Sequence, residues 1–243
     1  MGSTTPISGS AGGPLVAGVD GCRGGWVVVS ITPDGPGPVD VSAVPDLHGL
    51  VAQIDSGALI AAAIDIPIGL APKDPRRGDI EARRRLGGRR SSVFPAPVRA
   101  ALAATTYEEA CAISRATCGK AISRQLFNIL PKIREVDALM TPLRQQRLVE
   151  MSPELSLALL AGAPMAHSKL HRAGRAERMR ALATFFGSET IAHHTGRPPP
   201  GAQPDDVLDA FAGAWTARRY AAREHLQLGG DVDGRGLRME VVA

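Results

Sequence analysis

The sequence is poor in cysteine, in aromatic residues and in long apolar runs. Its 243 residues include three cysteines, an odd number without a CxxC spacing, which excludes a disulfide scaffold and a zinc ribbon. Aromatic residues are 4% of the chain, too few for a stacking platform that binds single-stranded nucleic acid. The longest apolar run, 59–71, is interrupted by Asp65 and Pro67, so no stretch is long enough to cross a bilayer.

An export signal is also missing from the sequence. Residues 1–14 have neither a charged start nor an apolar middle, and their Gly, Ser and Thr content predicts a disordered N-terminal segment. With no export signal and no disulfide framework, we expect the protein to reside in the cytoplasm and to have no membrane partner.

Lysine is scarce among the cations. The net charge is +4, from 28 Lys and Arg against 24 Asp and Glu, and only 4 of the 28 are lysines. Guanidinium groups bind phosphate oxygens in pairs, so an arginine-rich chain favours a nucleic-acid partner. High Ala, Gly, Pro and Arg content is also typical of GC-rich coding sequence, which leaves the charge open to a second explanation.

Apolar runs between Gly and Pro turns predict the first half of a sheet. At about 150 residues per domain, the length favours one elaborated domain. Strands over 15–20, 26–31 and 39–44 follow one another as antiparallel neighbours. A helix over 46–54 then leads to an apolar strand over 59–66, and a helix between two strands indicates a parallel crossover.

The rest of the chain predicts a helical insertion and a second set of helices. Residues 71–145 are rich in arginine and carry helical patterns over 107–117 and 122–139. A fifth strand over 147–151 then returns to the sheet. Helices over 154–161, 175–186 and from 205 or 206 to about 224, a loop over 193–203 and a short C-terminal strand over 237–242 complete the chain. The fold class is therefore α/β, a single domain over 15–243 with a mixed five-stranded sheet flanked by helices.

Four aspartates lie at the ends of these elements. Asp20 and Asp65 end two apolar strands, whereas Asp206 and Asp209 lie one turn apart at the start of the last helix. Burying an unpaired carboxylate costs several kcal/mol, so acids in apolar surroundings need cations or donors. Converging carboxylate oxygens suit Mg²⁺ or Mn²⁺, which can activate water for phosphodiester hydrolysis.

The last helix has a face of small residues that supports this convergence. At 100° per residue, Asp206 and Asp209 share one side with Ala210, Gly213 and Ala217. A helix with small side chains on one face can approach a sheet closely. We therefore expect that face, with both aspartates, to lie against the strands.

Each acid also has a purely structural interpretation. Asp206 at a helix start is an ordinary capping residue, and Asp20 before Gly21 suits a hairpin turn. Asp65 before Ile66 and a proline can cap a turn. Asp209 lies too far into the helix to be a cap.

Seven segments of the chain resemble a known family: VAGVDGCRGGWVVV, AAAIDIPIGL, LGGRRSSVFPAPVR, LPKIREVDALM, VEMSPELSLALLAG, PDDVLDAFAGAWTARR and GLRMEVVA. In this order, over residues 15–243, they are similar to domain-of-unknown-function family 429, described as a predicted ribonuclease-H-like nuclease. The resemblance implies a ribonuclease-H-like βββαβ core, a helical insertion, a fifth strand and a carboxylate-bearing C-terminal helix.

The resemblance also implies roles for the acids. Asp20, Asp65 and Asp209 fall where the metal ligands of this fold are expected, and Asp206 with Asp209 is similar to the paired aspartates of Holliday-junction-resolvase relatives. In VEMSPE the family more usually has His where this chain has Ser152. The resemblance therefore implies an auxiliary acid role for Glu154, with Glu150 as the alternative.

Basic residues in the same segments are candidate phosphate contacts: Arg23, Arg89, Arg90, Lys132, Arg134 and Lys169. Taken singly, each can equally be a solvated cation or the partner of a local acid. Together they predict the border of a groove that binds an anionic partner.

Three functions follow from these observations. The first is a nuclease in which Asp20, Asp65, Asp206 and Asp209 hold Mg²⁺ or Mn²⁺ and the partner is DNA or RNA; a homodimer would suit a junction-cutting enzyme. The second is a non-catalytic binding module of the same fold, for nucleic acid or for a protein. The third is a nucleotide-dependent phosphotransferase, although such enzymes need two of these cores and this chain shows one.

Overall fold

A five-stranded mixed sheet in the order β3-β2-β1-β4-β5 forms the centre of the molecule. The computed structural model describes residues 13–243, so the segment predicted to be disordered falls almost wholly outside the described residues. The strands are β1 (Leu15–Cys22), β2 (Gly25–Ile31), β3 (Asp40–Val44), β4 (Leu59–Ile64) and β5 (Leu148–Glu150). The first three are antiparallel, whereas β4 and β5 run parallel to β1, as the sequence predicts.

The hairpin between β1 and β2 depends on a glycine. Gly25 has a φ of 150°, a conformation that favours glycine. A Cβ at this position would lie 2.0 Å from the carbonyl oxygen of Val44 on the neighbouring strand. The absence of a side chain therefore lets β3 pair closely beside the turn.

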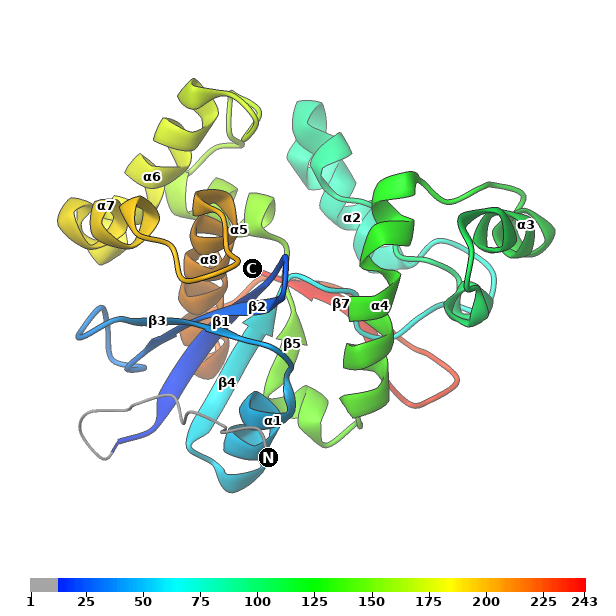
Figure 1. Cartoon of the computed structure of the whole chain (residues 1–243), viewed down its shortest axis with the longest axis horizontal. Helices are drawn as coiled ribbons and strands as arrows, with labels where there is room; N and C mark the ends of the chain where they lie inside the picture. Colours follow the sequence, from blue (N-terminus) through cyan, green and yellow to red (C-terminus); the bar gives the residue numbers. More distant parts are fainter. Residues whose placement is uncertain (1–12) are drawn as a thin grey trace.

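Helices cover both faces of the sheet (Figure 1). One face packs against α1 (His48–Ser56) and α4 (Arg124–Leu139), with α3 (Tyr107–Cys118) on the far side of α4. The other face is covered by α5 (Pro153–Ala161), α6 (Arg172–Phe186), α7 (Ser188–Gly196) and α8 (Pro204–Ala221). The side chains of β1 alternate between the two cores, with Val16 on the α8 side and Ala17 and Val19 on the α4 side. A strand buried on both faces explains why β1 is apolar throughout.

The insertion between β4 and β5 is helical, as predicted. It holds α2 (Arg77–Leu86), the 3₁₀ turns η1 (Gly87–Ser92) and η2 (Arg99–Ala103), α3 and α4. Its start is tied to the sheet by the buried guanidinium of Arg76, which donates to Glu150 Oε2 at 2.6 Å and also pairs with Asp79. Arg76, the first arginine of the arginine-rich segment, is thus buried in ion pairs within the protein.

The C-terminal region is a hairpin rather than the single strand that the sequence predicts. Two strands, β6 (Gln227–Val232) and β7 (Arg238–Val242), form a separate sheet. Gly229 and Gly230 in β6 have φ values of 83° and 113°, and the pairing register shifts there. This glycine bulge conceals the strand pattern in the sequence.

Two helix boundaries also differ from the prediction. The loop expected over 193–203 begins only after Gly196, because α7 extends to that residue. Ile191 is buried in the core and Thr195 Oγ1 donates to its carbonyl oxygen at 2.6 Å, so packing stabilises a helix with a weak pattern. The last helix, α8, ends at Ala221 rather than near residue 224, and Arg223 takes a left-handed φ of 60° just beyond it.

The strand order, the strand directions and the helix positions are those of a ribonuclease-H-like fold. Among the described residues, no helix combines the length and the apolar character that crossing a membrane requires.

Candidate functional site

Asp20 and Asp65 lie side by side at one end of the sheet. Asp20 is near the end of β1, and Asp65 directly follows the parallel neighbour β4, where its N–H donates to the Val19 carbonyl at 3.1 Å. The carboxyl ends of adjacent parallel strands are where open α/β sheets place their ligands. The two strand-end aspartates therefore share one edge, as their positions in the sequence predict.

Helix α8 brings Asp209 to the same edge. The helix crosses β1 with backbone against backbone: a Cβ on Gly18 would lie 2.0 Å from both Ala210 O and Ala214 N, and one on Gly213 would lie 2.8 Å from Gly18 Cα. Asp209 is one turn before Gly213 and is 4% exposed. The close approach predicted from the small residues of this helix thus positions the third carboxylate.

The electrostatics of Asp20, Asp65 and Asp209, which we call the carboxylate triad, indicate mutual repulsion. Burial, followed by the charge of Asp209, raises the pKa of Asp20 well above its ordinary value and raises the pKa of Asp65 to about 7. Burial likewise raises the pKa of Asp209. Like charges in a poorly solvated site oppose one another's ionisation, so the triad requires a compensating cation.

Asp20 and Asp65 differ from the other acids nearby in lacking a partner. Within residues 13–243, no group donates a hydrogen bond to either carboxylate, although Asp20 is 8% exposed and Asp65 is half-buried. The triad's third member is paired, since Lys169 Nζ lies 2.7 Å from Asp209 Oδ2. One buried and one half-buried carboxylate, both without hydrogen-bond donors, require positive charge nearby to offset their loss of solvation.

The donor set fits a hard divalent cation. Carboxylate oxygens are the ligands that Mg²⁺ and Mn²⁺ prefer, and the unpaired oxygens of Asp20 and Asp65 supply them. Among the described residues, no three His, Cys, Asp or Glu side chains are gathered closely enough to form a ready-made metal centre. The triad thus has the chemistry for a divalent ion, with the Lys169 ammonium on one of its carboxylates.

Glu150 and Glu154 are both buried and both paired with arginine. Glu150 accepts from Ile68 N at 2.7 Å and from Arg76, and burial, only partly offset by Arg76, raises its pKa to about 7. Glu154, in the first turn of α5, pairs through Oε1 with Arg178, and its Oε2 has no partner among residues 13–243. The charge of Glu154 contributes to the raised pKa of Asp65, so this acid lies beside the triad.

The sequence analysis did not identify Arg76 and Arg178 as the partners of these two acids. Arg178 is 1% exposed, the most buried cation of α6. The available signal was its position four residues before Leu182, on the apolar face of that helix. In a sequence with 24 arginines, a buried one is not distinguished by residue type alone.

Asp206 has a local role at the start of α8. Its carboxylate accepts from the backbone N–H of Gln203 at 2.8 Å, the reciprocal contact of a capping box, and it is half-buried. Its charge adds to the raised pKa of Asp20, which places it at the rim of the triad.

We expect Asp206→Ala to lower the free energy of unfolding by about 1 kcal/mol, because it removes one capping contact. The same variant should keep the Mn²⁺ affinity of the parent protein, since the triad is unchanged. Thermal denaturation and a calorimetric Mn²⁺ titration measure the two effects. A loss of Mn²⁺ binding larger than tenfold would show that Asp206 is a metal ligand.

The candidate phosphate contacts are divided between the site and the scaffold. Lys132 is near the triad, where it donates to Gly25 O and its Nζ lies 4.2 Å from the centre of the Trp26 ring. Arg23 is exposed at the β1–β2 hairpin. By contrast, Arg134 donates to the carbonyls of Leu102 and Ala104 and so stabilises η2.

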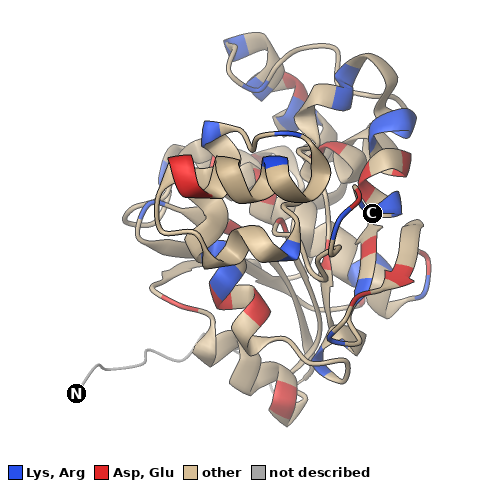
Figure 2. Cartoon of the chain, turned by 90° about the vertical axis from the view of Figure 1, so that its right-hand side faces the viewer, with Lys and Arg blue, Asp and Glu red and all other residues tan. Residues whose placement is uncertain are grey.

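Arg89 and Arg90 lie on η1, with Arg90 exposed and Arg89 half-buried. Figure 2 shows Lys and Arg interspersed with Asp and Glu over the side of the molecule that it turns to the viewer. The positive net charge is therefore not concentrated on that side.

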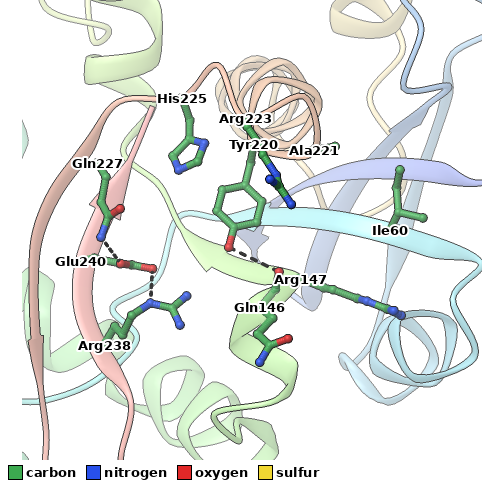
Figure 3. A pocket seen from close by; sticks show the side chains of 10 residues that line it. All are labelled: Ile60, Gln146, Arg147, Tyr220, Ala221, Arg223, His225, Gln227, Arg238 and Glu240. Carbon is green, nitrogen blue, oxygen red and sulfur yellow. Dashed lines mark hydrogen bonds and ion pairs between the residues drawn. The ribbon is translucent and has the colours of Figure 1, made fainter.

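A cavity of about 670 Å³ lies away from the triad, at the other end of α8 (Figure 3). Its lining includes Tyr220 in the last turn of that helix, Arg223 just beyond the helix, Arg147 just before β5 and Arg238 in β7. Its one carboxylate, Glu240, is neutralised by Arg238 at 2.9 Å. An 18-residue helix is about 27 Å long, so this cavity is not part of the carboxylate site.

Comparison with known proteins gives one match. A family model described as "Protein of unknown function (DUF429)" matches residues 18–233, which include the whole triad. No curated protein and no solved structure matches the chain.

Proposed function

We propose that this chain, which belongs to the DUF429 family of proteins of unknown function, is a metal-dependent nuclease that hydrolyses phosphodiester bonds. The observation that supports this most is a pair of carboxylates without donors, the buried Asp20 and the half-buried Asp65, at adjacent strand ends of a ribonuclease-H-like sheet. Structural acids elsewhere in this site are paired, as Glu150 with Arg76 shows. A carboxylate kept without a partner indicates a function that stability does not require.

In this proposal Asp20 and Asp65 hold Mg²⁺ or Mn²⁺, and Asp209 adjoins it from α8. A bound divalent ion supplies an activated water and neutralises charge on the phosphodiester. Glu154 lies beside the triad with one free oxygen and is the candidate to accept or position a proton. Arg23 lies on the hairpin that follows Asp20, and Lys132 lies beside that hairpin on α4. Both are candidates to contact the substrate's phosphates.

A binding module without catalysis is the second candidate. It is favoured by the contact between Lys169 and Asp209, because an acid already neutralised by a lysine needs no metal. In that case nucleic acid or a protein would bind the exposed arginines. The binding of nucleic acid would depend strongly on salt and would not change when Asp20 is replaced.

The test is a Mn²⁺ titration of the purified protein and of Asp20→Asn, followed by cleavage assays on duplex DNA, an RNA–DNA hybrid, single strands and branched DNA. We expect the parent protein to bind Mn²⁺ and to cut at least one substrate, and Asp20→Asn to do neither. Asp34→Asn, in an exposed turn, is the control and should behave as the parent does. Salt-dependent binding without Mn²⁺ uptake or cleavage would support the binding module instead.

A further inference from the structure

Among residues 13–243, Lys169 is the one cation that forms an ion pair with the carboxylate triad. Its Nζ lies 2.7 Å from Asp209 Oδ2, and the charge of Asp209, which is 5% exposed at its side chain, keeps the pKa of Lys169 raised. The charges of Asp20 and Asp65 act on Lys169 in the same direction. The ammonium group is therefore shared electrostatically by the whole triad.

The position of Lys169 is fixed by contacts on both sides of it. It belongs to the turn before α6, where the guanidinium of Arg178 donates to His167 O at 3.0 Å and also pairs with Glu154. On the other side, a Cβ on Gly174 would lie 2.0 Å from Ser168 O, so helix and turn are in backbone contact. The glutamate that adjoins the triad thus also holds the turn that carries Lys169.

The charges of the site suit one divalent ion better than two. Three ionised carboxylates and one ammonium leave two negative charges, which one divalent cation balances. Two divalent ions beside the ammonium would leave two positive charges in a poorly solvated site, which is costly. Without Lys169, the second carboxylate-lined position at Asp209 would be open to a cation.

We propose that the Lys169 ammonium takes the place of a second metal ion at Asp209, so that the triad binds a single divalent ion. This proposal rests on the proposed function, because it requires the triad to bind metal. Lys169 is then a positioning residue that supplies fixed positive charge. Its side chain is 45% exposed, so part of it can also face an anionic substrate.

The test counts Mn²⁺ ions per chain, by calorimetry and by the electron paramagnetic resonance signal of free Mn²⁺. We expect one ion for the parent protein and for Lys169→Arg, which keeps the charge. Lys169→Met, similar in length but neutral, should bind two. The control is Lys120→Met, at an exposed lysine distant in sequence, which should bind one.

Two ions in the parent protein, or one in Lys169→Met, would overturn this inference and leave the proposed nuclease standing. Absence of Mn²⁺ binding from every variant would overturn both. Circular dichroism of Lys169→Met should match the parent protein, because the residue lies in an exposed turn; if it does not, Lys169→Gln replaces it in the same count.

Discussion

Asp65→Asn is expected to abolish Mn²⁺ binding and to raise the melting temperature of the metal-free protein at pH 8 by several degrees. Burial and the charge of Asp209 raise the pKa of Asp65 to about 7, above its ordinary value of 3.8. The folded protein therefore binds this proton more tightly than the unfolded chain does. Above pH 7 the carboxylate is ionised in the folded state at a cost that asparagine does not have.

The sign of the pH dependence follows from the same shift. Because the pKa of Asp65 is raised by folding, the metal-free protein loses stability as the pH rises from about 4 to about 7, and the contribution is constant above that. The loss is on the order of a few kcal/mol, since each tenfold change in proton affinity is worth about 1.4 kcal/mol. In a chain of this size, that corresponds to several degrees in melting temperature.

Thermal denaturation of the metal-free parent, of Asp65→Asn and of the exposed control Asp34→Asn, at pH 4.5 and pH 8, measures this effect. The gain for Asp65→Asn should appear at pH 8 and nearly vanish at pH 4.5. Saturating Mn²⁺ should reverse the order, because the parent protein and Asp34→Asn bind the ion and Asp65→Asn does not. Equal melting temperatures for all three proteins at pH 8 would contradict the electrostatic description of the triad.

Gly18→Ala is expected to prevent stable folding. The added Cβ would lie 2.0 Å from two backbone atoms of α8, Ala210 O and Ala214 N, and neither can move without the helix. Overpacking a rigid core costs about 1–3 kcal/mol when side chains can adjust, and more when backbone must shift. A cost of 3 kcal/mol or more is a large part of the roughly 5–15 kcal/mol that stabilises a domain.

The matched control is Gly24→Ala in the β1–β2 turn, where an added Cβ meets nothing within 4 Å. Urea denaturation followed by circular dichroism should show a normal transition for Gly24→Ala and a lost or strongly weakened one for Gly18→Ala. If Gly18→Ala unfolds at the same urea concentration as the parent protein, α8 does not contact β1 as described.

Local sequence pattern predicted the elements that carry the triad. The apolar runs before Asp20 and Asp65 and the small face of α8 each depend on neighbouring residues, which a sequence displays directly. Helix α7 and strand β6 were missed for the opposite reason. Packing of Ile191 stabilises the first, and the bulge at Gly229 and Gly230 interrupts the second.

The pairing of charges could not be predicted in the same way. Arg76 with Glu150 and Lys169 with Asp209 join residues far apart in the chain, and a single sequence has no signal for such partners. Glu154 was expected as an auxiliary acid. Its ion pair with Arg178 also gives it a structural role, which its sequence motif does not indicate.

The backbone contact between β1 and α8 also determines when the triad can form during synthesis. Gly18 and Gly213 are separated by most of the described chain, so this contact closes only after α8 has been made. At roughly 5–20 residues per second, the ribosome needs on the order of 10–40 s to travel between the two glycines. During that interval the nascent chain displays the apolar strands of a half-covered sheet. We therefore expect the need for chaperones during folding in the cell to depend on the time that passes before α8 is synthesised.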